Sequence, residues 1–177
     1  TEIYTLSLHD ALPICPNLLL GGTEEKKAEA YYKIVAECCD YAAEKRVGLS
    51  VKPHGGNNAN GAQCRRIIDR INHKSLRLWY DPGNIFYYSD GALDPVNDAA
   101  VVDGVVVGMS VKDFKPPKAV ALTPGTGIVD FPKVLARLKQ GGFTGGPLVV
   151  ECLAPGDLPH LAVEAARSRQ FLCELTA

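Results

Sequence analysis

The chain has 177 residues, and its 19 Lys and Arg against 20 Asp and Glu leave a formal charge of −1. With 46% hydrophobic and 22% charged residues, it has the composition of one ordinary globular domain with its own core. The balanced charge argues against nucleic acid or an anionic membrane surface as partners. No apolar run approaches the roughly 18 residues that span a bilayer.

The beginning of the chain is unusual. It starts with Thr1, and residues 2–14 (EIYTLSLHDALPI) resemble a translated sequencing-adaptor read-through. This stretch lacks the basic residues that precede the apolar part of a secretory signal. We therefore predict that residues 1–14 are a non-native leader, with a genuine strand and turn as the alternative.

From residue 16 onward, short apolar runs alternate with helical patterns at intervals of about thirty residues, the length of a βα unit. The apolar runs predict strands at 17–21, 47–51, 76–80, 105–111 and 147–150. Helices are predicted after an N-cap at Thr23, then at 62–72, 94–102, 131–140 and 158–175. Residues 81–84 are predicted to be a turn.

Strands that are apolar throughout and joined by helices indicate a parallel α/β fold. An open doubly wound sheet and part of a (β/α)₈ barrel both fit this pattern. No glycine-rich phosphate loop follows a strand. Instead, polar residues follow four successive strands: Lys52 and His54, Asp81 and Asn84, Ser110 with Lys112 and Asp113, and Glu151. We therefore predict a partial (β/α)₈ TIM barrel of about five βα units, whose mouth gathers these residues.

The six cysteines show neither C-x-x-C nor zinc-finger spacing. They are interpreted as free thiols, which favour a reducing, cytoplasmic compartment. A signal peptide upstream of residue 1 would not be visible in this sequence.

Two positions near the predicted mouth suggest chemistry. Glu151 interrupts an apolar strand, and an ionised carboxylate there needs a cation or hydrogen-bond donors. Trp79 lies two residues before Asp81 and offers an aromatic wall of the kind that packs on sugars, with core packing as the plain alternative.

Four segments occur in this order at and after successive strand ends: YDPGNIFYY (80–88), SVKDF (110–114), PGTGIVDF (124–131) and GGPLVVECL (145–153). Together they resemble the sugar phosphate isomerase/epimerase group, the xylose isomerase-like TIM barrels that also include endonuclease IV. The resemblance runs from about residue 17 to the end of the chain. It implies that residues 15–177 are the C-terminal portion of such a barrel.

Enzymes of this group hold a divalent metal with a Glu, an Asp, a His and a second Glu, while a ligand Glu moves a proton beside a carbonyl. The resemblance assigns Asp81 to the Asp and Glu151 to the last Glu. Lys52-Pro-His54 stands where Glu-x-His is often found, and Ser110 stands where His begins the H-x-K-D motif.

These departures leave two interpretations open. In the first, His54, Asp81 and Glu151 hold Mn²⁺ or Zn²⁺ in a remodelled site. In the second, the ammonium group of Lys52 replaces the metal between the two carboxylates. Lys52 could also act as a base or form a Schiff base with a ketose.

The expected function is isomerisation or epimerisation of a sugar or sugar phosphate at the barrel mouth. Glu151 and Lys52 are the predicted catalytic residues, and Trp79, Asn84, Lys112 and Asp113 are predicted to bind substrate. The alternative is a non-catalytic carbohydrate-binding barrel with a degenerate metal site. A nuclease like endonuclease IV is disfavoured, because the charge is balanced and few histidines lie near strand ends.

A complete barrel takes about 250 residues. We therefore expect the chain to be a fragment of a larger enzyme, and whether the fragment is active by itself stays open. An open half-barrel exposes two strand edges, so instability or association into a homo-oligomer is expected.

Overall fold

The computed structural model describes residues 17–177, so the predicted leader and Cys15 lie outside the described residues. The sheet has five strands: β1 (Asn17–Leu20), β2 (Gly48–Val51), β3 (Leu76–Tyr80), β4 (Val106–Val111) and β5 (Leu148–Val150). The helices are α2 (Glu25–Glu44), α3 (Gly61–Ile71), α4 (Pro82–Tyr88), α5 (Pro95–Ala99), α6 (Phe131–Gln140) and α7 (Leu158–Thr176). Two short 3₁₀ turns are η1 (Gly56–Asn58) and η2 (Ala100–Val102).

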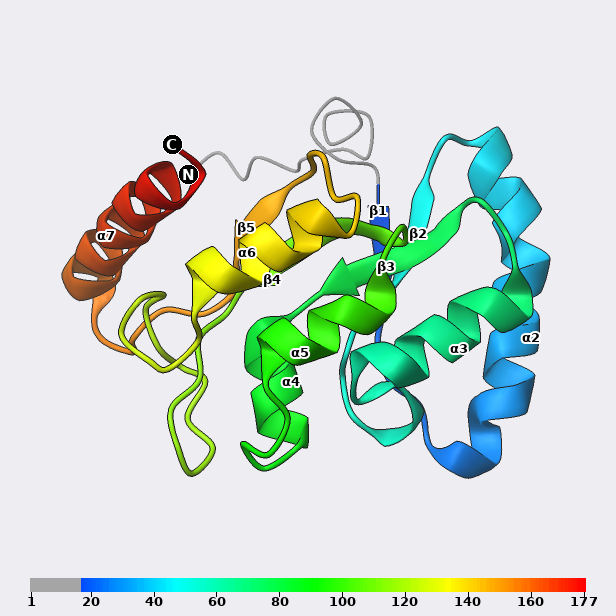
Figure 1. The fold of residues 1–177 in the computed structure, drawn as a ribbon, viewed down its shortest axis with the longest axis horizontal. Helices are drawn as coiled ribbons and strands as arrows, with labels where there is room; N and C mark the ends of the chain where they lie inside the picture. Colours follow the sequence, from blue (N-terminus) through cyan, green and yellow to red (C-terminus); the bar gives the residue numbers. More distant parts are fainter. Residues whose placement is uncertain (1–16) are drawn as a thin grey trace, which may run out of the picture.

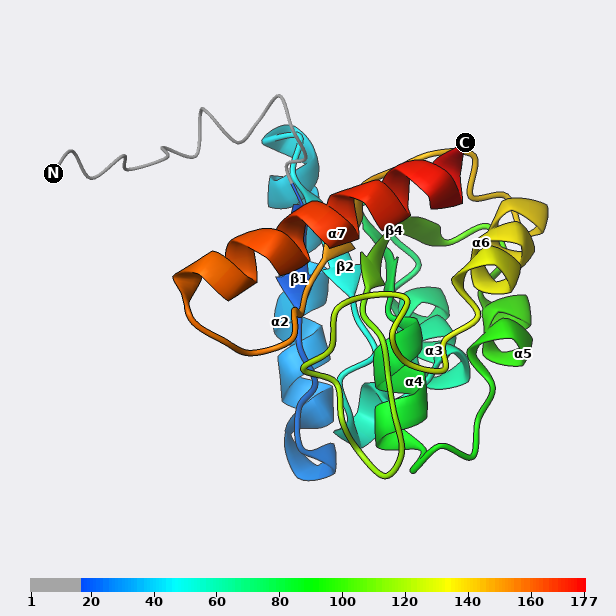
Figure 2. The ribbon, with the colours of Figure 1, turned by 90° about the vertical axis from the view of Figure 1, so that its left-hand side faces the viewer.

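All strands are parallel and lie in the order β1-β2-β3-β4-β5, so each strand pairs with the next one along the chain. They form a half-barrel with helices packed around it (Figure 1), and α7 crosses one end of the assembly (Figure 2). The predicted partial (β/α)₈ barrel and its parallel strands are confirmed.

Two predictions about helices are wrong, one about where a helix begins and one about a turn. The first helix begins at Glu25 and has Glu24, not Thr23, at its N-cap, with no side-chain capping bond. The predicted turn at 81–84 is the start of α4. Asp81 Oδ1 accepts a hydrogen bond from the Asn84 amide at 2.8 Å, and Pro82 occupies the first helical turn. An N-cap Asp followed by Pro is a helix-start signal that could have revealed α4.

The core lies between the sheet and its helices. Alternate strand residues, such as Val51, Leu78 and Met109, are fully buried there. Because side chains alternate across a strand, the intervening residues belong to the opposite face of the sheet. That face carries polar side chains such as Ser50 and Ser110 beside apolar ones such as Trp79 and Val149.

A buried carboxylate joins three elements at the edge of this core. Asp98, in α5, accepts hydrogen bonds from the Gly61 amide at 3.0 and 3.1 Å and from the Tyr80 hydroxyl at 3.1 Å. Burial raises the pKa of Asp98, while the bonds from Gly61 and Tyr80 oppose that rise. The bonds tie β3 and the start of α3 to α5.

The described cysteines, Cys38, Cys39, Cys64, Cys152 and Cys173, are free thiols, as the sequence indicated. Within residues 17–177, no helix combines the length and apolar character needed to cross a membrane.

Candidate functional site

Four charged side chains meet where β2, β3, β4 and β5 end. Lys52 follows β2, Asp81 follows β3, Lys112 follows β4 and Glu151 follows β5. The carboxyl ends of parallel strands meet at one edge of the sheet, so residues far apart in sequence converge there. We call these four residues, together with Ser110 in β4, the lysine–carboxylate cluster.

Lys52 lies at the centre of the cluster. Its side chain is 8% exposed, and its Nζ lies 3.0 Å from Asp81 Oδ2 while also donating a hydrogen bond to Glu151 Oε2. One ammonium group therefore bridges two carboxylates. This is the placement that the second sequence interpretation required.

Glu151 is the more accessible carboxylate, with 31% of its side chain exposed. Besides Lys52, it accepts hydrogen bonds from Lys112 Nζ at 2.9 Å and from Ser110 Oγ at 2.8 Å. Burial opposes ionisation of Glu151, but the bonds from Lys52, Lys112 and Ser110 outweigh it and lower its pKa to about 2. Glu151 is therefore a stable anion surrounded by donors.

Asp81 has the opposite electrostatic character. It is fully buried, and burial raises its pKa to about 6, although Lys52 favours the ionised form. The charge of Glu151 adds to this rise. Lys112 differs again: burial disfavours its charged form, but Asp81 and Glu151 outweigh that effect and raise its pKa.

Ser110 links the cluster to Trp79. The Trp79 indole Nε1–H donates to Ser110 Oγ at 3.0 Å, and the Ser110 hydroxyl in turn donates to Glu151. A side chain at Gly108, on the neighbouring strand, would collide with the Trp79 ring. Trp79 is only 5% exposed, so the structure shows it as a support for Ser110 and not as an open aromatic wall.

Two predicted substrate-binding residues make bonds within the protein instead. The Asn84 side-chain amide donates to the Pro53 carbonyl at 2.7 Å. The buried carboxylate of Asp113 accepts four backbone amides at 2.7–3.1 Å, from Phe114, Gly125, Gly127 and Val129. Asp113 thus fixes the loop after β4, and we assign it a structural role in place of the predicted substrate contact. Of the predicted binding residues, Lys112 lies in the cluster.

His54 does not join Asp81 and Glu151. Its side chain is exposed, its ring packs against Tyr88 with centroids 5.9 Å apart, and its amide donates to the Asn58 carbonyl at 2.9 Å. The turn after Lys52 therefore directs the histidine away from the cluster. Within the described residues, no group of three or more His, Cys, Asp or Glu side chains is placed to hold a metal ion.

The donor set argues against a divalent metal in this cluster. Only the carboxylates of Asp81 and Glu151 could act as ligands, and Lys52 Nζ lies between them, where a cation would bind. A lysine ammonium has donors and no acceptor. The predicted Mn²⁺ or Zn²⁺ site at His54, Asp81 and Glu151 does not fit the residues as they are placed.

A parallel α/β half-barrel with polar residues at the carboxyl ends of its strands defines a class: barrel-type α/β proteins whose candidate site lies at the mouth. Residues 5–175 match the family model of the xylose isomerase-like TIM barrel. The chain belongs to this family, as the resemblance at the strand ends implied.

Solved structures share the fold at low sequence identity. A xylose isomerase domain protein from Planctomyces limnophilus superposes with a TM-score of 0.72 at 18% identity, covering 95% of this chain and 61% of that one. A D-tagatose 3-epimerase-like protein gives 0.71 at 16%, covering 96% and 65%. D-allulose 3-epimerase from Methylomonas sp., solved with D-allulose, gives 0.62 at 18%, covering 88% and 57%.

The chain thus spans roughly three fifths of the length of these structures. A comparison with curated protein sequences gives no match.

Proposed function

We propose that the chain carries the site of a sugar or sugar-phosphate isomerase/epimerase-like enzyme, in which the lysine–carboxylate cluster takes the place of a metal. The observation that carries the proposal is the ammonium group of Lys52 between Asp81 and Glu151. The family membership and the epimerases among the similar structures support this class of substrate.

The chemistry is proton transfer at a carbon next to a carbonyl. Glu151 is the more exposed of the two cluster carboxylates, so it takes the proton from that carbon. Lys52 and Lys112 donate to the carbonyl oxygen, where negative charge develops as the enediolate forms. In an isomerisation Glu151 returns the proton to the neighbouring carbon. In an epimerisation Glu151 releases its proton to solvent, and a water molecule on the other side of the enediolate supplies a proton to the opposite face of the same carbon.

The electrostatics of the free site suit this transfer. Glu151 is a weak base while Lys52, Lys112 and Ser110 stabilise its charge. When Lys112 turns toward the substrate oxygen, Glu151 loses a donor and its basicity rises as the enediolate charge grows. Asp81, buried beneath Lys52, keeps that ammonium group in position and does not itself reach the substrate.

Hydrogen exchange tests the proposal with the chain as it stands. D-Tagatose and D-allulose are incubated in D₂O with EDTA, and NMR follows exchange of the proton next to the carbonyl. We expect exchange with the unaltered chain and its loss in Glu151→Gln. Glu174→Gln, which changes an exposed carboxylate on α7, is the matched control and should exchange normally. Exchange that persists in Glu151→Gln would end the assignment of Glu151.

A second candidate is a non-catalytic carbohydrate-binding barrel. The residues of the cluster favour this alternative. The family resemblance implies metal-ligating Glu and His side chains at the positions where this chain has Lys52 and Ser110. Saturable binding of D-tagatose without any proton exchange would identify the chain as a binder.

A further inference from the structure

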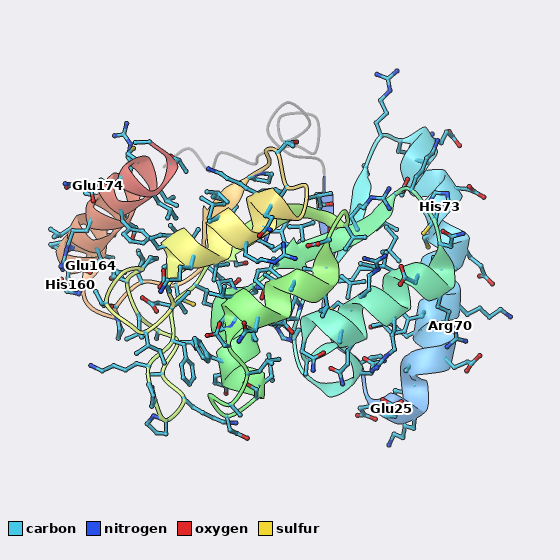
Figure 3. All side chains as sticks on the ribbon, in the orientation of Figure 1. Glu25, Arg70, His73, His160, Glu164 and Glu174 are labelled. Carbon is cyan, nitrogen blue, oxygen red and sulfur yellow. The ribbon has the colours of Figure 1, made fainter. Side chains whose placement is uncertain are left out.

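A hollow lies on the outer side of the half-barrel, between α2 and α3. Its volume is about 430 Å³, within the range of roughly 300–1,000 Å³ typical of small-molecule pockets. None of the residues that line it belongs to the lysine–carboxylate cluster. Figure 3 shows Glu25 and Arg70 at the right-hand end of the molecule, opposite the end where α7 lies. We call this hollow the α2–α3 pocket.

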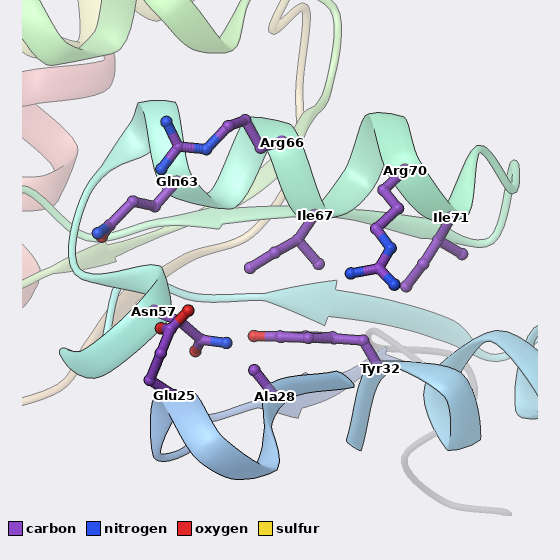
Figure 4. A pocket seen from close by; sticks show the side chains of 9 residues that line it. All are labelled: Glu25, Ala28, Tyr32, Asn57, Gln63, Arg66, Ile67, Arg70 and Ile71. Carbon is purple, nitrogen blue, oxygen red and sulfur yellow. The ribbon is translucent and has the colours of Figure 1, made fainter. Parts of the chain in front are cut away.

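The floor of the pocket contains an unsatisfied hydroxyl group. Tyr32 is 6% exposed, yet its hydroxyl has no hydrogen-bond partner among the described residues. Figure 4 shows the ring lying along the pocket with its oxygen pointing toward Asn57. Burial raises the pKa of Tyr32 well above its ordinary value, so the phenol keeps its proton and remains a donor.

Asn57, another lining residue, holds an unsatisfied acceptor. The side-chain oxygen of Asn57 is inaccessible and has no partner within residues 17–177. The Gln63 side chain also lines the pocket, and its oxygen accepts from the Ala59 amide at 2.6 Å, which leaves its NH₂ group to donate. Buried polar groups without partners are rare in native proteins, and a ligand is one way to satisfy them.

The wall formed by α3 is positively charged. Arg66 and Arg70 are one helical turn apart, and both line the pocket. Arg70 Nη2 pairs with Glu29 Oε1 at 2.8 Å, whereas Arg66 has no carboxylate partner in the described part of the chain. Glu25 lines the side formed by α2 (Figure 4). Guanidinium groups match the planar geometry of carboxylates and the oxygens of phosphates.

We propose that the α2–α3 pocket is a binding site for a small hydroxylated anion, a sugar acid or a sugar phosphate. Its carboxylate or phosphate binds Arg66 and Arg70. Its hydroxyl groups accept from the Tyr32 hydroxyl and from the Gln63 side-chain amide. The aliphatic side chains of Ala28 and Ile67 contact the carbon chain of the ligand. The site is independent of the chemistry proposed for the lysine–carboxylate cluster.

Isothermal titration calorimetry with D-gluconate, D-glucose 6-phosphate, D-glucose and inorganic phosphate tests the site. We expect at least one of the two hydroxylated anions to bind with 1:1 stoichiometry, and neutral D-glucose to bind at least about tenfold more weakly. Binding of D-gluconate alone would identify a carboxylate ligand, and binding of D-glucose 6-phosphate alone a phosphate ligand. Failure of both hydroxylated anions to bind would overturn the proposal. Inorganic phosphate binding as tightly as the sugar phosphate would overturn the hydroxyl contacts.

Variants locate the binding. Arg66→Gln, at an exposed position where folding is not at risk, should weaken binding about tenfold. Tyr32→Phe should weaken it about threefold or more without lowering thermal stability, because it removes a buried hydroxyl that has no partner. Arg65→Gln, on the same helix but paired with Asp69, is the matched control and should bind normally.

A further variant separates the pocket from the barrel mouth. Lys112→Met changes the lysine–carboxylate cluster and should leave this binding unchanged. If binding is lost in Lys112→Met and retained in Arg66→Gln, the anion occupies the mouth and the α2–α3 site is refuted.

Discussion

Replacing Lys52 with methionine tests the central contact of the lysine–carboxylate cluster. Methionine keeps the length and apolar character of the side chain but removes the charge. Among the described residues, Asp81 is then left fully buried with no cation in contact, while Glu151 keeps its bond from Lys112. The variant therefore isolates the electrostatic contribution of a single ammonium group.

The distance between the Lys52 and Asp81 charges determines how much stability the substitution should cost. Unit charges 3.0 Å apart attract by about 5 kcal/mol at an effective dielectric constant of about 20. Removing one partner of a buried pair typically costs about 3–5 kcal/mol. Because a domain of this size is stable by only about 5–15 kcal/mol, we expect Lys52→Met to lose a large share of its free energy of unfolding.

Urea denaturation at pH 7.5 measures this loss, and a double variant provides the control. Lys52→Met with Asp81→Asn removes both charges, so it should recover at least about half of the lost stability. A loss below about 1 kcal/mol in Lys52→Met would refute the reasoning, because it lies in the range of an exposed pair. A double variant no more stable than the single variant would refute it too.

Further predictions concern the same site. The pKa of Asp81 is about 6 in the folded protein, above its ordinary 3.8. The stability that protonated Asp81 contributes at low pH is therefore lost as the pH rises from about 4 to 6. In urea denaturation, Asp81→Asn should abolish this dependence of stability on pH. Ser110→Ala removes a donor to Glu151 and should raise its pKa above about 2, as carbon-13 NMR titration would show. Asp113→Asn leaves backbone amides of the loop after β4 poorly paired, and should reduce the free energy of unfolding by about 1–3 kcal/mol. Lys52→Glu with Ser110→His adds two ligands beside Asp81 and Glu151, and should bind Mn²⁺ in calorimetry where the unaltered chain does not.

Each of these has an outcome that contradicts it. A pH profile of stability unchanged by Asp81→Asn would mean that this carboxylate titrates normally. An unmoved Glu151 titration in Ser110→Ala would remove the serine from the electrostatics of the cluster. Full stability of Asp113→Asn would show that the amide replaces the carboxylate as acceptor. Absence of Mn²⁺ binding in the double variant would show that more than ligand identity separates this cluster from a metal site.

The sequence by itself determined the strands and the kind of sheet. Short apolar runs, separated by helical patterns, predicted all five strands within a residue or two, because local hydrophobic patterning decides which segments can be buried. The parallel order followed from the helices between them. Parallel strands end at one edge, so the convergence of Lys52, Asp81, Lys112 and Glu151 was also predictable.

Only the tertiary structure decided which of these residues touch. Lys52 and Glu151 are 99 positions apart, and nothing local to either of them specifies their hydrogen bond. The turn after Lys52 sends His54 outward, and the loop after β4 uses Asp113 for its own amides. The α2–α3 pocket likewise arises where two helix faces meet. Local patterns determine the backbone elements, whereas side-chain partners are determined by packing between segments that are distant in the chain. For this reason the sequence left open whether a metal ion or the ammonium group of Lys52 lies between Asp81 and Glu151.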